Sequence, residues 1–249
     1  MRLRSLIVTA ALLSLAGCGD DDEDTATPRL TVSAAASLKT PFEDYGRSFE
    51  TARFSFAGSD ELAAQIRQGV KPDVYAAANT QLPEQLFRDG LVEKPTVFAG
   101  NRLVLAVPLG SGGPRSIEDL AHDGLKLVIG AESVPVGAYT RDALARLAPE
   151  TRKAILANVR SEEPDVAGIV GKLTQGAADA GFVYLTDVVA TRSRLKAIEL
   201  PRSLQLEIEY GVALVKGAPE PEAAQEFIDG LLEGDGLEAM KRAGFLPPG

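Results

Sequence analysis

Short strand-like segments alternate with helix-like segments along most of this chain. Alternating or continuously apolar runs predict strands, and apolar side chains at helical spacing predict helices between them. The predicted strands are 29–34, 54–56, 73–77, 103–107, 126–130, 180–184 and 204–215, and the predicted helices are 38–51, 60–68, 82–89, 139–147, 150–158, 166–175, 222–232 and 236–243. This alternation predicts an α/β fold with mixed, mostly parallel sheets flanked by helices.

Two connections predict that the chain forms two lobes. A glycine-rich segment, 110–113, follows the strand that ends at Val107, and a second long strand region returns late in the sequence. If both runs cross between lobes, residues 29–106 and 212–249 form lobe 1 and residues 107–211 form lobe 2. We therefore expect a two-strand hinge, with ligands bound beyond the carboxyl ends of the strands.

The beginning of the chain has the pattern of an export signal. In residues 1–17, two arginines precede an apolar run, residues 6–15, which is about half of the ~20 residues that a spanning helix needs. The segment that ends at Cys18 resembles a bacterial lipoprotein signal, which implies cleavage before this cysteine and lipid attachment to its thiol. The alternative is an ordinary signal with a chance cysteine. Residues 18–28 contain five consecutive acids and predict a solvated tether.

The composition excludes several classes of protein. The net charge of −9 argues against a nucleic-acid-binding protein. One cysteine and one histidine exclude a disulfide framework and a multi-histidine metal site, and the absence of tryptophan excludes a sugar cleft built on indole rings. His122 lies in a predicted exposed turn, and neither a nucleophile elbow nor a phosphate-binding loop occurs. We therefore expect neither an enzyme nor a cofactor.

Two serines follow predicted strands of lobe 1 at the points where helices begin. Ser37 follows three alanines, and Ser59 follows Ala57 and Gly58. A helix start offers unpaired N–H groups and the positive end of the helix dipole, so two neighbouring starts form a cradle for an anion. Each serine could instead be a helix N-cap. The sequence alone leaves both interpretations open.

Lobe 2 offers three further candidate donors. Val136 lies in a Pro-Val-Gly turn before a predicted helix, and Val166 follows Asp165, the expected N-cap of the next helix. Backbone N–H groups of this turn, and the Val166 N–H at the next helix start, could face a cleft. Tyr184 ends a buried strand, and its hydroxyl group could reach the cleft, although the ring could equally be an ordinary part of the core edge.

An ordered set of motifs resembles the periplasmic molybdate-binding proteins of bacterial ABC importers. The matching segments are 31–38, 56–59, 62–66, 72–74, 101–105, 134–139, 181–187 and 244–245, and they span residues 29–246. The resemblance implies a two-lobed periplasmic-binding-protein fold that closes on molybdate or tungstate. It also implies that the oxyanion is held by Ser37, Ser59, Val136, Val166 and Tyr184, with no direct bond from the protein to the metal. The implied partner is an inner-membrane permease, and we expect a monomer at the periplasmic or cell-surface face of a membrane.

Several alternatives remain at this stage. Asp60 occupies a position that is often a small hydroxyl residue in the family; it either points to solvent or faces the cleft, where a carboxylate would repel a dianion. Sulfate, phosphate or an organic acid could be the ligand; Arg141 is the nearest candidate to bind a carboxylate, although an arginine on the helix surface is the favoured interpretation. A lipid-anchored hydrolase and a structural lipoprotein are the alternatives from other classes.

Overall fold

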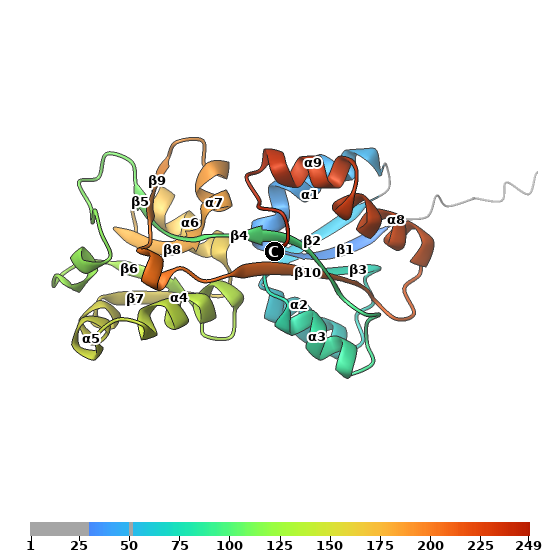
Figure 1. The fold of residues 1–249 in the computed structure, drawn as a ribbon, viewed down its shortest axis with the longest axis horizontal. Helices are drawn as coiled ribbons and strands as arrows, with labels where there is room; N and C mark the ends of the chain where they lie inside the picture. Colours follow the sequence, from blue (N-terminus) through green and yellow to red (C-terminus); the bar gives the residue numbers. More distant parts are fainter. Residues whose placement is uncertain (1–29, 50–51) are drawn as a thin grey trace, which may run out of the picture.

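The computed structural model describes residues 30–49 and 52–249, which form two lobes side by side (Figure 1). Each lobe contains one five-stranded sheet with helices on both faces. The two-lobed α/β fold expected from the sequence is confirmed. The predicted signal, the lipid attachment at Cys18 and the acidic tether lie outside the described residues. No helix in the described ranges is long and apolar enough to cross a membrane.

The sheet of lobe 1 has the order β2-β1-β3-β10-β4. Strand β1 pairs in parallel with β2 and β3, whereas β10 is antiparallel to β3 and β4. The strands are β1 (Thr31–Ala35), β2 (Arg53–Ala57), β3 (Val74–Ala77), β4 (Thr96–Asn101) and β10 (Ile208–Leu214). The helices are α1 (Lys39–Tyr45), α2 (Ser59–Arg67), α3 (Gln81–Arg88), α8 (Pro221–Leu232) and α9 (Asp235–Arg242).

The sheet of lobe 2 has the order β7-β6-β8-β5-β9 and repeats the same plan. Strand β6 is parallel to β7 and β8, and β5 is antiparallel to β8 and β9. The strands are β5 (Leu103–Pro108), β6 (Leu127–Gly130), β7 (Val159–Glu163), β8 (Ala180–Tyr184) and β9 (Leu195–Glu199), and the helices are α4 (Pro135–Ala145), α5 (Pro149–Ala157), α6 (Val166–Thr174) and α7 (Leu185–Ala190).

The crossings between the lobes lie earlier in the sequence than we expected. Strand β4 ends at Asn101 in the first sheet, and β5 begins at Leu103 in the second, so the first crossing is at Arg102 rather than after residue 106. The return lies between β9 and β10, before residue 208 rather than at 212. The glycine-rich segment 110–113 is a loop of lobe 2. The apolar strand β5 is therefore a core strand of the second sheet, buried between β8 and β9.

The first predicted helix, 38–51, is shorter in the structure. Helix α1 ends at Tyr45 and continues only as a 3₁₀ turn, Gly46–Ser48. The Ser48 hydroxyl donates to the Tyr45 carbonyl oxygen at 2.6 Å. A side-chain bond of this kind competes with the backbone bonds that would extend a helix. The apolar side chains of α1 still pack into the core as the helical spacing predicts, with Phe42 fully buried.

Candidate functional site

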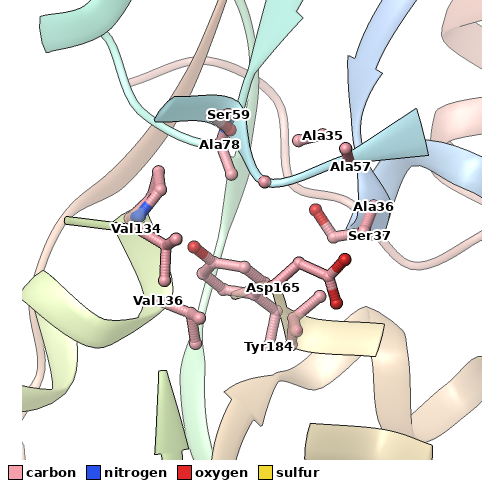
Figure 2. Close-up of a pocket in the computed structure, with 13 residues that line it drawn as sticks. Ala35, Ala36, Ser37, Ala57, Ser59, Ala78, Val134, Val136, Asp165 and Tyr184 are labelled. Carbon is pink, nitrogen blue, oxygen red and sulfur yellow. The ribbon is translucent and has the colours of Figure 1, made fainter. Parts of the chain in front are cut away.

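A small cavity lies between the lobes at the carboxyl ends of parallel strands from both sheets. The volume that the centre of a water molecule can occupy in this cavity is about 20 Å³. A cavity of this size suits a small ion rather than an organic molecule. Figure 2 shows Ser37 and Ser59 on one side and Val136 and Tyr184 on the other. The cavity is lined by Ala35, Ala36, Ser37, Ala57, Gly58, Ser59, Ala78, Val134, Pro135, Val136, Asp165, Val166 and Tyr184. All five predicted ligand residues are among them.

Ser59 is almost fully buried at the start of α2, and its hydroxyl oxygen already accepts a hydrogen bond from the protein. The Ala78 N–H donates to Ser59 Oγ at 3.1 Å, and the Tyr75 hydroxyl donates to the Ser59 carbonyl oxygen at 2.7 Å. The N-cap of α2 is Gly58, and Ser59 is the first residue of the helix itself. Because Ser59 Oγ accepts the Ala78 N–H, its own hydrogen remains free to donate to a ligand in the cavity.

Ser37 is also buried, in a 3₁₀ turn that follows β1. Its Oγ lies 3.0 Å from the hydroxyl oxygen of Tyr210, a residue of β10. No side-chain cap is formed at the start of this turn or of α1. The structure therefore uses neither serine as an N-cap, and the interpretation that explained both as ordinary caps is wrong.

The two valines present backbone N–H groups at helix starts of lobe 2. Val136 is the second residue of α4 and Val166 is the first of α6, so the helix itself supplies no acceptor for either N–H group. Asp165 is the N-cap of α6, as predicted, and accepts from the Gly168 N–H at 2.8 Å. This bond uses the Gly168 N–H, and the Val166 N–H remains available to the cavity.

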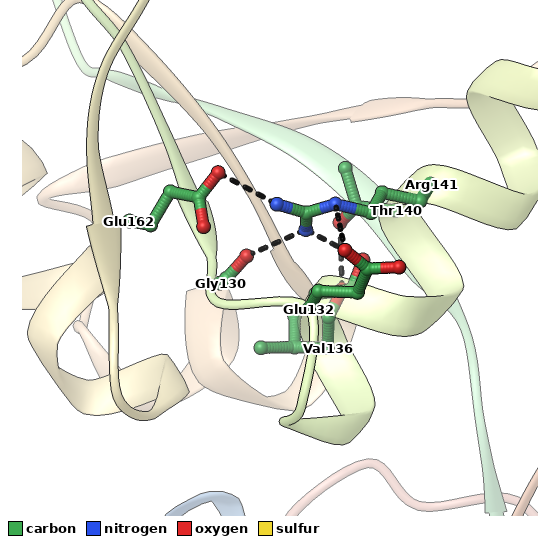
Figure 3. Close-up of polar contacts among 7 residues, drawn as sticks. Gly130, Glu132, Val136, Thr140, Arg141 and Glu162 are labelled. Atoms are coloured by element: carbon green, nitrogen blue, oxygen red, sulfur yellow. Dashed lines mark hydrogen bonds and ion pairs between the residues drawn. The ribbon is translucent and has the colours of Figure 1, made fainter.

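The turn that carries Val136 is tightly packed and braced by Arg141 (Figure 3). A Cβ atom at Gly137 would lie 2.5 Å from the Gly130 carbonyl oxygen, so only glycine fits there. Arg141 Nη1 donates to the Gly130 carbonyl oxygen at 2.9 Å, and Nη2 pairs with Glu162 Oε1 at 2.7 Å. The Arg141 guanidinium is thus occupied outside the cavity. The suggestion that it binds an organic carboxylate is wrong.

Tyr184 is buried at the end of β8. Its hydroxyl oxygen is buried and has no hydrogen-bond partner among the described residues. Burial, followed by the neighbouring Tyr210, raises the pKa of Tyr184 well above its ordinary value, so the hydroxyl keeps its proton. A buried donor without an acceptor is costly, and an anion in the cavity would supply that acceptor.

Charged side chains are almost absent from the cavity wall. Within the described part of the chain, no Lys or Arg lines it, and Asp165, the one acid in that lining, is held by its cap bond. Asp60 does not line the cavity; its Oδ1 is buried beside Gly58 without a partner among the described residues. Asp60 therefore neither points wholly to solvent nor contacts the ligand position. The site offers uncharged donors fixed to rigid helix starts.

Metal-binding and nucleophilic chemistry find little support in the described residues. No group of three or more His, Cys, Asp or Glu within them could hold a metal ion. His122, the only histidine, is exposed and does not line the cavity, so it does not activate either serine.

Three residues that support the site were not found from the sequence. Ala78 follows β3 as Ser37 follows β1, and its N–H fixes Ser59. Tyr210 and Asn101 lie behind Ser37, where Asn101 Nδ2 donates to Tyr210 Oη at 3.3 Å. The only signal for Ala78 is its place after a predicted strand, and nothing in the sequence pairs Tyr210 with Ser37.

Residues 30–246 match the family described as bacterial extracellular solute-binding proteins. The chain belongs to this family. The molybdate-binding protein ModA of Mycobacterium tuberculosis is 33% identical over 88% of this chain and 85% of its own. A putative ABC transporter substrate-binding lipoprotein of Bacillus subtilis is 29% identical over 94% of each chain. The structure of the periplasmic molybdate-binding protein of Azotobacter vinelandii superposes with a TM-score of 0.79 at 21% identity, over 89% of this chain and 100% of that one, and shows the same fold.

The two lobes of this solute-binding protein touch beside the cavity at Gly58. A Cβ atom there would lie 2.5 Å from the carbonyl oxygen of Pro164 in lobe 2. The backbone angles of Gly58, φ −60° and ψ 136°, are open to any residue. Glycine is therefore required by the close approach of the lobes and not by the local conformation.

Asp187 gives this solute-binding protein a pH-dependent stability. Burial raises the pKa of Asp187 to about 7. The hydrogen bond from the Tyr184 N–H lowers this pKa, and the negative charge of Asp165 raises it. In the unfolded chain this carboxyl has its ordinary pKa of 3.8. Between pH 3.8 and about 7 the folded protein therefore holds a proton that the unfolded chain has lost, and the free energy of unfolding falls as the pH rises through this range.

Asp187→Asn removes this loss of stability and keeps an acceptor for the Tyr184 N–H. Thermal unfolding should show a stability gain for D187N that is absent near pH 4, grows towards pH 7 and then levels off; a constant difference across this range would contradict the assignment.

Proposed function

We propose that this protein binds molybdate or tungstate between its lobes and delivers it to the permease of an ABC importer. The observation that carries the proposal is the cavity itself, which is small, shared by both lobes and surrounded by uncharged hydrogen-bond donors. The similarity to molybdate-binding proteins of other bacteria supports the same ligand class. Ser37, Ser59 and Tyr184 supply hydroxyl groups, and Val136 and Val166 supply backbone N–H groups.

A site that offers only hydrogen-bond donors favours tetrahedral anions that carry no proton. Molybdate and tungstate carry no proton near neutral pH and can accept a hydrogen bond on every side. Hydrogen phosphate carries a proton that would face only donors, which is unfavourable in a buried site. Sulfate has no such proton and is disfavoured only by its smaller radius. Molybdate and tungstate have nearly the same size and bind alike.

The same geometry supports a binding role without catalysis. Among the residues that the structure describes, neither serine donates to a histidine, since Ser59 Oγ accepts a backbone N–H and His122 is exposed. Ligand contacts both lobes, so binding favours the closed form, which the permease recognises. The protein needs no cofactor and acts as a monomer, anchored to the outer face of a membrane by lipid on Cys18.

Ser59→Ala tests this function through one hydroxyl group. It removes one charge-assisted bond, so the affinity for molybdate should fall by roughly 1–3 kcal/mol in calorimetric titration. Molybdate should raise the melting temperature of the wild-type protein by mass action, and phosphate should not. Unchanged affinity would remove Ser59 from the site. The absence of heat and of any thermal shift with molybdate, tungstate and sulfate would overturn the function.

A further inference from the structure

A buried chain of side chains runs from the hinge to the cavity. It joins Asn101 at the end of β4, Tyr210 in β10 and Ser37 after β1, all of which belong to lobe 1. Asn101 Nδ2 lies 3.3 Å from Tyr210 Oη, and Tyr210 Oη lies 3.0 Å from Ser37 Oγ. Tyr210 is fully buried. The chain of contacts is therefore sealed from water up to the serine that lines the cavity.

The backbone fixes the orientation of the Asn101 amide. The Arg102 N–H, which can only donate, lies 2.9 Å from Asn101 Oδ1. The other end of the amide is thus the NH₂ group, and it donates to Tyr210 Oη and to Thr186 Oγ1, the latter at 2.9 Å. Tyr210 must accept from Asn101.

The hydroxyl hydrogen of Tyr210 then has one acceptor. Burial raises the pKa of Tyr210 well above its ordinary value, so the hydrogen stays in place. Of the groups bonded to Tyr210 Oη, Ser37 Oγ alone can accept it, since Asn101 Nδ2 is a donor. If Ser37 donated to Tyr210 instead, the Tyr210 hydrogen would have to turn to the neighbouring Tyr184 hydroxyl, which forms no hydrogen bond with it at the observed geometry.

We propose that Tyr210 is a positioning residue that holds Ser37 as a donor towards the cavity and thereby sets the preference for proton-free oxyanions. This inference rests on the proposed function and adds the device that makes it selective. Tyr210 acts on Ser37 as the Ala78 N–H acts on Ser59. Each donates a hydrogen bond to the serine Oγ from the side away from the cavity, so the serine hydrogen faces the ligand. The bonds that join Asn101, Tyr210 and Ser37 lie within lobe 1, and a further bond from Asn101 Nδ2 to Thr186 Oγ1 reaches α7 of lobe 2.

Loss of the Tyr210 hydroxyl would release this constraint. In Tyr210→Phe, Ser37 Oγ has no donor behind it, so the Ser37 hydroxyl can rotate and accept a hydrogen bond from a ligand. Molybdate would lose a fixed donor, whereas hydrogen phosphate would gain an acceptor for its proton. Selectivity should change more than stability does.

The direction of the hydrogen bond can be tested without any ligand. In proton NMR of the ligand-free protein, we expect a protected hydroxyl resonance that is lost in Tyr210→Phe and moves in Ser37→Ala. Tyr45→Phe is the matched control, because Tyr45 is another buried tyrosine of lobe 1, whose hydroxyl donates to the Phe227 carbonyl oxygen at 3.3 Å, away from the cavity. A Tyr210 resonance that Ser37→Ala leaves unmoved would overturn the proposal.

Calorimetric titration of the same variants with molybdate and hydrogen phosphate tests selectivity. In Tyr210→Phe, we expect molybdate affinity to fall about tenfold and the preference for molybdate over phosphate to fall by more. Tyr45→Phe should keep both values. If Tyr210→Phe kept the wild-type preference for molybdate over phosphate, the role of Tyr210 would be contradicted, but the proposed function would not. If the wild-type protein bound no oxyanion, the proposed function would fail, and the NMR experiment would still decide how Ser37 is oriented.

Discussion

Gly58→Val is expected to hold the lobes apart and to weaken molybdate binding about 100-fold or more, because affinity falls with the population of the closed form. A Cβ atom at this position would lie 2.5 Å from the Pro164 carbonyl oxygen and 2.9 Å from Asp60 Oδ1. The Pro164 oxygen belongs to the backbone of lobe 2 and cannot turn aside as a side chain does. We therefore expect the clash with the Pro164 oxygen to be relieved by opening the cleft.

The same substitution should leave the lobes folded. Gly58 has extended backbone angles that valine adopts readily, so the backbone of lobe 1 gains no strain, and within lobe 1 only the Asp60 side chain has to turn away from the new Cβ atom. Small-angle scattering should show the wild-type protein compacting with molybdate and the variant remaining extended. Gly171→Ala in α6 is the matched control, because its Cβ atom would meet only Gln175 Nε2 at 3.7 Å. Wild-type affinity and compaction in the Gly58 variant would show that closure does not bring these lobes together as described.

Tyr184→Phe is expected to lower molybdate affinity by about 10- to 100-fold, as the loss of one hydrogen bond to a charged group does. The ring stays, so packing against Tyr210, with ring centroids 5.7 Å apart, is preserved. The change removes one hydroxyl group that points into the cavity and has no partner among the described residues.

Stability separates this role from a structural one. Since the Tyr184 hydroxyl makes no bond to another described residue, its removal should leave the melting temperature of the ligand-free protein unchanged or slightly raised. Calorimetric titration and thermal unfolding of the same preparation give both values. A variant that loses stability but keeps its affinity would place Tyr184 in the core and not in the site.

The sequence predicts central strands better than edge strands. Strands β1, β3, β5, β6 and β8 were all expected, because each is a continuous or alternating apolar run. Strands β4, β7 and β9 were not expected, and all three lie at sheet edges, whereas β2, the fourth edge strand, was expected at 54–56. One face of strand β7 is exposed and carries Arg160 and Glu162, so its sequence lacks the apolar run of a buried strand. The lobe boundary was misplaced for a related reason: nothing local marks Arg102 as the crossing.

The site follows the same division between local and tertiary information. Small residues and hydroxyl groups after strands indicated Ser37 and Ser59 as candidates, a helix start indicated Val166, and the resemblance to a known family added Val136. The direction of each hydrogen bond depends on partners far away in sequence, such as Tyr210 for Ser37, and no local pattern reveals it. Arg141 shows the converse, because its position near the turn suggested a ligand contact, whereas its partners are Gly130 and Glu162.

The most direct test is a crystal structure of the protein with molybdate, using anomalous scattering from molybdenum to locate the ion. We predict one strong peak between the lobes, with the oxyanion within hydrogen-bond distance of the Ser37, Ser59 and Tyr184 hydroxyl groups and of the Val136 and Val166 N–H groups, and no Lys or Arg in contact. A peak elsewhere, or an ion in the cleft from which Ser37 and Tyr184 are turned away, would contradict the account.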